Sequence, residues 1–263
     1  HTRPAQNPDD APFRWAELPS GTTSEHLVGK TLQYSISLNG VPAGDAEIAF
    51  VNMNNHSASE NGMAIQYKAQ TTATFAWAFS WETTGVTWAH RNDLLPRISY
   101  RHTIENGESE HSWMKFDRIR RSASHIKMKS DDSTPDYSEL SFAHGFNWPT
   151  LFARLASLRV LEGERPTFDV IDGDRAYVVQ VINTGQRASL SMERGAYTSR
   201  KLKIIITRLI AENDGQDTPS HRPNSAHIWV DDQTHLPLKI QYRSPLGRIT
   251  AVLASDVPGR NDM

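Results

Sequence analysis

The segment that decides the fold is Asn147-Trp-Pro-Thr-Leu-Phe-Ala-Arg-Leu-Ala-Ser-Leu-Arg159, because it is the clearest helix in a sequence that elsewhere predicts β-strands. Proline is favoured at the first helical position, where its missing N–H would have no partner within the helix. Pro149 therefore begins a predicted helix of about residues 149–160. The apolar residues repeat at helical spacing and form one stripe of Leu151, Phe152, Leu155 and Leu158. Arg154, Ser157 and Arg159 lie outside this stripe. A short helix with one apolar face is not stable alone in water, so we expect it to pack on a sheet.

The residues before and after this helix alternate as antiparallel strands do. Residues 31–38 place leucine, tyrosine and isoleucine on one face and glutamine and serine on the other. Turn residues separate such runs, as at Asn39-Gly40 and Asp172-Gly173-Asp174. We therefore predict a mainly β fold, which is a curled antiparallel sheet or open half-barrel with one central α-helix between two strand-rich halves.

The 263 residues suffice for one large β domain. Residues 1–25 contain several prolines among polar residues and predict a flexible tail. Residues 26–257 predict a single domain, with strand-rich halves at about 26–145 and 164–257. The first residue is His1 and not Met, which a trimmed chain or a removed leader explains. We expect a removed leader, and hence an exported protein of the periplasm or the cell surface.

The composition excludes several classes of function. The absence of cysteine rules out disulfides, thiolate metal sites and a cysteine nucleophile. A net charge of −2 gives no reason to expect nucleic acid as a partner. No apolar run approaches the roughly 20 residues of a membrane helix. The sequence contains no Gly-x-Ser-x-Gly elbow, no His-Glu-x-x-His motif and no glycine-rich phosphate loop, so it predicts no cofactor and favours a protein without enzymatic activity.

An aromatic run, Phe75-Ala-Trp-Ala-Phe-Ser-Trp81, is the first candidate binding feature. Its aromatic content and its flanking threonines favour a strand over a helix. As a strand, it places four large rings on one face, namely Phe75, Trp77, Phe79 and Trp81. Such rings bury much area, so core packing is the commoner role. The alternative is the wall of a pocket for an apolar ligand or a sugar.

Residues 97–116 predict a β-hairpin, because Asn106-Gly107 is the preferred two-residue turn. This turn fixes the register and places His102 opposite His111, and Tyr100 opposite Trp113. Two opposed imidazoles could share a metal or a ligand, but a metal site needs a third ligand and the sequence places none beside them. We expect this face to point inward or into a cleft. The opposite face, which carries Arg101, Thr103, Glu110 and Ser112, is expected to be solvated.

Three other features could carry chemistry. Asp231 and Asp232 are paired carboxylates, although aspartate is also among the commonest turn residues. His144 precedes the helix and could reach the sheet. An authentic N-terminal His1 could bind copper together with His102 or His111, but a trimmed chain explains it more simply. None of these features leads to a predicted metal site or catalytic residue.

Three segments resemble the DUF3108 family of bacterial exported proteins. They are the opening run Gly29-Lys-Thr-Leu-Gln-Tyr-Ser-Ile-Ser-Leu-Asn-Gly-Val-Pro-Ala-Gly44, the helix Leu151 to Arg159 with Gly163, and the closing run Ile228-Trp-Val-Asp-Asp-Gln-Thr-His-Leu-Pro237 with Gly247. The resemblance spans residues 29–254 and implies a curled sheet around a helix in the cell envelope. The family often has Asp and Ser just before the helix, whereas this chain has Asn147, Trp148 and Pro149. The resemblance implies no catalytic residue.

These observations favour a non-enzymatic envelope protein that binds a lipid or a glycolipid in a concave, aromatic-lined sheet. An alternative is an enzyme or binding module for polysaccharide, with tryptophan on the sugars and histidine or aspartate for chemistry. A further alternative is an assembly factor that binds a protein partner through an open sheet edge. The predicted ligand-binding residues are Phe75, Trp77, Phe79, Trp81, Tyr100, His102, His111 and Trp113. A cavity beside the helix would favour binding, and a filled interior would favour the assembly factor.

Overall fold

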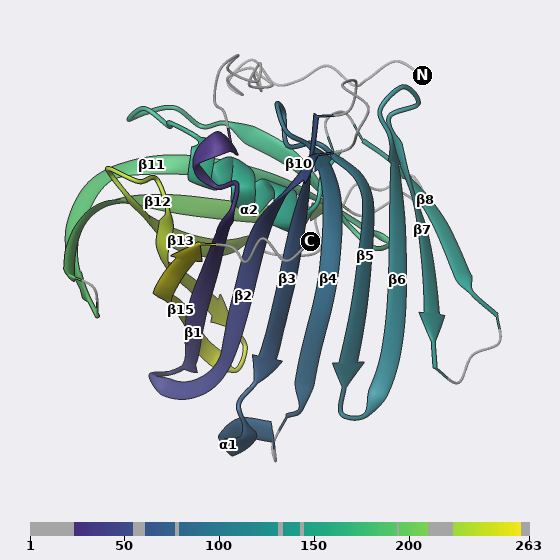
Figure 1. The fold of residues 1–263 in the computed structure, drawn as a ribbon, viewed down its shortest axis with the longest axis horizontal. Helices are drawn as coiled ribbons and strands as arrows, with labels where there is room; N and C mark the ends of the chain where they lie inside the picture. Colours follow the sequence, from purple (N-terminus) through teal and green to yellow (C-terminus); the bar gives the residue numbers. More distant parts are fainter. Residues whose placement is uncertain are drawn as a thin grey trace.

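The computed structural model describes residues 24–54, 61–76, 79–130, 134–142, 145–193, 195–209 and 223–258. The predicted tail of residues 1–25 lies outside these ranges except for its last two residues, as do His1, Trp77 and His144. The fold is mainly β with a large open sheet, which confirms the predicted class (Figure 1). No helix within the described ranges is long and apolar enough to span a membrane.

The first half of the chain forms eight consecutive strands and two short helical segments. The strands are β1 Lys30–Leu38, β2 Val41–Asn54, β3 Asn61–Thr71, β4 Trp81–His90, β5 Pro96–Glu105, β6 Glu108–Asp117, β7 Ser122–Lys129 and β8 Asp136–Ser141. The helical segments are a 3-10 turn at Ser24–His26 and α1 at Ala73–Ala76. The predicted strand from Phe75 to Trp81 is therefore wrong at its start, because Phe75 belongs to α1 and the strand begins at Trp81.

The second half contains the helix and the remaining strands. These are β9 Gly145–Phe146, α2 Trp148–Ser157, β10 Thr167–Asp172, β11 Arg175–Met192, β12 Gly195–Leu209, β13 Asn224–Asp231, β14 Pro237–Ser244 and β15 Gly247–Pro258. Within the described ranges, the strands form one 15-stranded sheet in the order β8-β7-β6-β5-β4-β3-β2-β1-β15-β14-β13-β12-β11-β10-β9. The first and last strands pair with each other, so the two edges of the sheet, β8 and β9, come from the middle of the chain.

Helix α2 lies between the two halves of the curled sheet (Figure 1). Leu151, Leu155 and Leu158 pack with buried residues of β10 to β13. Ala153 and Ala156, on another side of the helix, pack with buried residues of β1 to β3, β14 and β15. The helix and its apolar stripe are confirmed, but more than the stripe is buried, because sheet covers the helix on both sides.

Two polar residues of α2 show the effect of this enclosure. Arg154 is 1% exposed and Ser157 is 7% exposed, although both lie outside the apolar stripe. Burial lowers the pKa of the Arg154 guanidinium, and the nearby Asp93 carboxylate partly opposes this effect. Ser157 donates its hydroxyl hydrogen to the backbone carbonyl of Ala153.

The start of α2 is tied to the sheet by Asn147. Its side-chain oxygen accepts a hydrogen bond from the Thr150 N–H at 3.1 Å, and the Thr150 hydroxyl accepts from the Asn147 N–H, which completes a capping box. The Asn147 amide also donates to the Thr87 hydroxyl on β4 at 2.8 Å. These bonds fix the first turn of α2 over the concave face of the sheet.

Candidate functional site

A cavity of about 530 Å³ lies between the concave face of β2 to β6, the start of α2 and the turn that joins β10 to β11. This volume is within the range of small-molecule sites, which is roughly 300–1,000 Å³. Its residues divide by chemistry into two walls. The apolar wall is formed by Ala46, Ile48, Ala69, Trp148, Pro149 and Phe152. The polar wall is formed by Thr83, Ser99, Arg101, Thr103, Glu110, Ser112 and Asp172.

The apolar wall comes from β2, β3 and the first turn of α2, and contacts with neighbouring rings hold its aromatic residues in place. Phe152 meets Tyr34 edge to face, with ring centroids 6.1 Å apart. Trp148 packs against Tyr177 of β11 at 5.5 Å. Such packing restricts the side-chain rotamers, so the cavity is formed before a ligand arrives.

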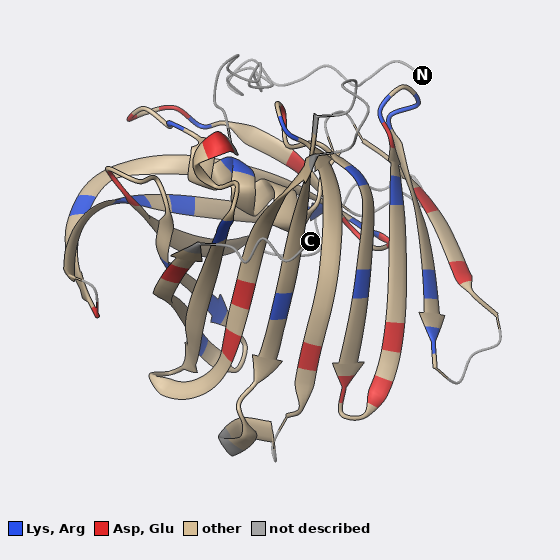
Figure 2. Ribbon diagram, in the orientation of Figure 1, with Lys and Arg blue, Asp and Glu red and all other residues tan. Residues whose placement is uncertain are grey.

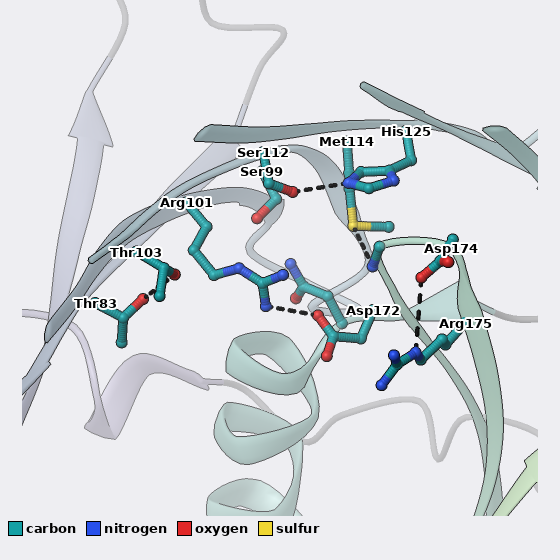
Figure 3. A network of polar contacts seen from close by, with 12 residues as sticks. Thr83, Ser99, Arg101, Thr103, Ser112, Met114, His125, Asp172, Asp174 and Arg175 are labelled. Atoms are coloured by element: carbon teal, nitrogen blue, oxygen red, sulfur yellow. Dashed lines mark hydrogen bonds and ion pairs between the residues drawn. The ribbon is translucent and has the colours of Figure 1, made fainter. Parts of the chain in front are cut away.

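Arg101 and Asp172 dominate the polar wall. An Arg101 guanidinium N–H donates to Asp172 Oδ1 at 2.8 Å, which connects β5 to the end of β10 (Figure 3). Burial lowers the pKa of Arg101, but the charge of Asp172 and its hydrogen bond oppose this effect, and the pKa is raised overall. Among the described residues, no acceptor lies within hydrogen-bonding distance of the Arg101 Nε–H group.

The other charges at the cavity are also paired. Glu110 pairs with Lys127 of β7 at 3.3 Å. Lys68 borders the cavity, but it lies opposite Thr84 on the outer face of the sheet, where it pairs with Glu82 of β4 at 3.2 Å. Figure 2 shows both acidic and basic residues along β2 to β6, with acidic residues at the turn between β5 and β6. The cavity therefore presents no strong field of either sign.

Several hydroxyl groups also line the cavity beside these charged residues. The Thr83 and Thr103 hydroxyls lie 3.1 Å apart, and both side chains line the cavity. Ser99 bonds to the Thr87 hydroxyl at 3.0 Å. Each hydroxyl offers one donor and two acceptor positions, so these bonds leave capacity for a ligand.

Ser112 forms a hydrogen bond with a buried histidine. Its Oγ lies 2.9 Å from His125 Nε2 (Figure 3). On the other side of the ring, His125 Nδ1 lies 3.4 Å from the Ser138 hydroxyl. Burial lowers the pKa of His125, with Asp174 opposing and Arg101 reinforcing the effect. A neutral His125 with its proton on Nδ1 would accept from Ser112 and donate to Ser138.

The predicted hairpin of residues 97–116 has the expected register, with His102 opposite His111 and Tyr100 opposite Trp113. The predicted orientation of its faces is wrong. The residues that line the cavity are on the face of Arg101, and Trp113 on the other face is 36% exposed. Met114 and Phe116 share the inward face and are buried, and their alternation with Lys115 is the sequence signal that could have identified it.

The two histidines thus form an outer-face pair. Their rings stack with centroids 4.4 Å apart, the Tyr100 hydroxyl bonds to His111 Nδ1 at 2.9 Å, and His102 Nε2 bonds to Ser109 at 2.8 Å. Within the described ranges, no group of three or more His, Asp or Glu residues is placed to hold a metal ion.

The aromatic run of residues 75–81 contributes only in part to the lining of the cavity. Trp81 lines it, whereas Phe79 is 39% exposed and Phe75 is half-buried in α1. Trp77 lies outside the described residues. Asp231 accepts hydrogen bonds from the backbone N–H and the hydroxyl of Thr234, so it stabilises its turn as the commoner interpretation expects.

The fold and this cavity define a barrel-like β protein with an open sheet that encloses a helix. The chain belongs to the DUF3108 family of proteins of unknown function, whose family model matches residues 33–254. This match confirms the resemblance seen in the opening, middle and closing segments.

One solved structure shares the fold, and a second is a weaker match. The β-barrel-like DUF1849 protein from Brucella abortus is 11% identical, with a TM-score of 0.53 over 88% of this chain and 97% of that chain. A protein from Bacteroides fragilis with a YmcC-like fold is 7% identical, with a TM-score of 0.31 over 87% of this chain and 95% of that chain. No curated protein matches the sequence.

Proposed function

We propose that this protein binds an amphipathic small molecule of the bacterial cell envelope, a lipid or a glycolipid, and holds it without converting it. The observation that carries the proposal is the cavity of about 530 Å³ with one apolar wall and one polar wall. A ligand with an apolar part and a polar part would satisfy both walls at once. The location in the periplasm or at the cell surface belongs to the same proposal, and cell fractionation tests it.

The position of α2 supports binding over a purely structural role. Its first turn lies over the concave face and contributes Trp148, Pro149 and Phe152 to the apolar wall, but it does not fill the space beneath. The apolar part of the ligand would lie against these residues and against Ile48 of β2. Burial of apolar area there would provide most of the affinity, at about 25 cal/mol per Å² before ordering costs.

Native mass spectrometry of the protein purified from its own host tests the proposal. We expect a co-purified ligand that is released on denaturation. The Ala46→Phe variant, which places a ring in the cavity, should lose this ligand. The Ala49→Phe variant changes the same strand on the opposite face and should keep it. Equal ligand content in the two variants would contradict binding in this cavity.

A second candidate function is ester hydrolysis, which the Ser112–His125 contact favours. Ser112 lines the cavity, its hydroxyl is 2.9 Å from His125 Nε2, and Ser138 could hold the histidine in the required tautomer. Arg101 lies directly across the strand pair from Ser112 and could stabilise an oxyanion. A fluorophosphonate probe that labels Ser112, and that fails to label the Ser112→Ala variant, would favour this function over simple binding.

A further inference from the structure

We infer that the polar end of the ligand is an uncharged group rich in hydroxyls, such as a sugar, and not a phosphate, carboxylate or ammonium group. The inference rests on the proposed binding function and specifies its ligand class. Three features of the polar wall carry it, namely the pairing of its charges, its donor and acceptor groups, and the position of Tyr67.

The first feature is the pairing of charges. Arg101 is held by Asp172 at 2.8 Å, and Glu110 by Lys127 at 3.3 Å. An anionic ligand group placed against Arg101 would compete with Asp172 for the guanidinium and would also face Glu110. A cationic group placed against Asp172 or Glu110 would have to displace Arg101 or Lys127. Breaking one buried or half-buried pair to form another gives little net gain, so neither charge type is favoured.

The second feature is the arrangement of donors and acceptors. Thr83, Thr103 and Glu110 are direct neighbours across β4, β5 and β6, and Arg101 and Ser112 form the next row on the same face. Adjacent strands are about 4.8 Å apart, and residues i and i+2 are about 6.6 Å apart along a strand. A group with several hydroxyls can therefore meet several of these side chains together. The Arg101 Nε–H has no acceptor among the described residues and is itself buried, so a ligand hydroxyl would reach it only after a small shift of the guanidinium.

The third feature is Tyr67, which adds a hydroxyl and not a charge. Its ring lies over Gly85 of β4, where any Cβ atom would overlap the Tyr67 hydroxyl. Burial raises the pKa of Tyr67 to about 12, with Arg101 opposing and Asp172 reinforcing the effect. The phenol is therefore neutral at physiological pH and can both donate to and accept from a sugar hydroxyl.

A matched series of single-chain ligands tests the inference. Octyl glucoside, octyl phosphate and octyltrimethylammonium carry the same eight-carbon alkyl chain, and octanoate carries a seven-carbon chain on its carboxylate. Isothermal titration calorimetry would measure their affinities below the micellar concentration. We expect the glucoside to bind at least about tenfold more tightly than each charged ligand, which corresponds to about 1.4 kcal/mol. A charged ligand that binds as tightly as the glucoside or more so would overturn the inference and leave the proposed function in place. Failure of all four to bind would overturn both.

Two threonine variants test whether hydroxyl groups of the polar wall determine the affinity for the glucoside. Thr103→Val removes a hydroxyl of the polar wall at nearly constant volume, and we expect it to weaken glucoside binding at least about fivefold with little effect on octanoate. Thr84→Val makes the same change on the outer face of β4 and should have no effect. Circular dichroism would check that both variants fold. Equal weakening of glucoside and octanoate by Thr103→Val would contradict recognition through the hydroxyl.

Discussion

Arg101 on β5 and Asp172 at the end of β10 are 71 positions apart in the sequence and form an ion pair of 2.8 Å inside the cavity. The pair connects the two halves of the sheet at a point distant in strand order from the β1–β15 pairing. Around it, Ile171 of β10 packs with Met114, Phe116 and Ala123 of β6 and β7. The end of β10 therefore contributes Asp172 to the cavity and also packs against β6 and β7 across the open sheet.

Removing this ion pair should destabilise the protein. For Asp172→Asn we expect a loss of about 1–3 kcal/mol in the free energy of unfolding, because the charge-assisted hydrogen bond of Arg101 is lost. Asp174→Asn is the matched control, since its pair with Arg175 is longer, 3.7 Å, and largely exposed. It should cost less than about 0.5 kcal/mol. Urea denaturation measures both, and equal losses would mean that the Arg101–Asp172 pair has no special role.

Gly85 should not tolerate a side chain. A Cβ atom there would overlap the Tyr67 hydroxyl and the Tyr100 backbone oxygen, and the backbone oxygen cannot move without disturbing the β4–β5 pairing. Gly85→Ala should therefore cost about 1–3 kcal/mol, as overpacking does elsewhere. At Gly62 of β3 the nearest atoms are 3.8 Å from the added Cβ, so Gly62→Ala should be nearly neutral. Thermal denaturation would reveal the difference, and a stable Gly85→Ala variant would contradict the packing described for Tyr67.

The inner and outer tryptophans of the sheet should differ in their effect on ligand binding. Trp81 lines the cavity, whereas Trp113 is 36% exposed on the opposite face with the His102–His111 pair. With octyl glucoside as the probe, Trp81→Ala should weaken binding at least about fivefold, or about 1 kcal/mol. Trp113→Ala should leave the affinity unchanged within about twofold. The reverse result would place the ligand on the outer face.

The stability should decrease as the pH falls below about 6.5. Burial lowers the pKa of His125, and also those of His227 and His235, from the ordinary value of 6.5. The unfolded chain then binds more protons than the folded chain between 6.5 and the folded pKa values, so the free energy of unfolding falls with pH through that interval. His125→Gln should make the decrease shallower while leaving the stability near pH 8 less affected. Urea titrations from pH 8 to pH 5 measure this slope, and an unchanged slope would show that His125 is equally protonated in both states.

The sequence by itself determined the elements that depend on near neighbours. Asn106-Gly107 set the register of β5 and β6, and Pro149 with the stripe of Leu151, Leu155 and Leu158 set helix α2, because turn geometry and helical spacing act over a few residues. The alternation along β5 and β6 also separated Arg101 from His102 correctly, one to each face of the sheet.

The tertiary structure decided that the face of Arg101 points inward, against the prediction, although the buried Met114 and Phe116 share that face. Charged side chains usually face solvent, so the face with Arg101 was predicted to be outside. The opposite face, with the two histidines and Trp113, was therefore predicted to be inside. In the structure Arg101 and Glu110 face the cavity instead, because Asp172 and Lys127 from other strands neutralise their charges. The same is true of Arg154, whose burial depends on sheet packed against both sides of α2. A charge can be buried only when its surroundings compensate it, and those surroundings are assembled from residues far apart in the chain.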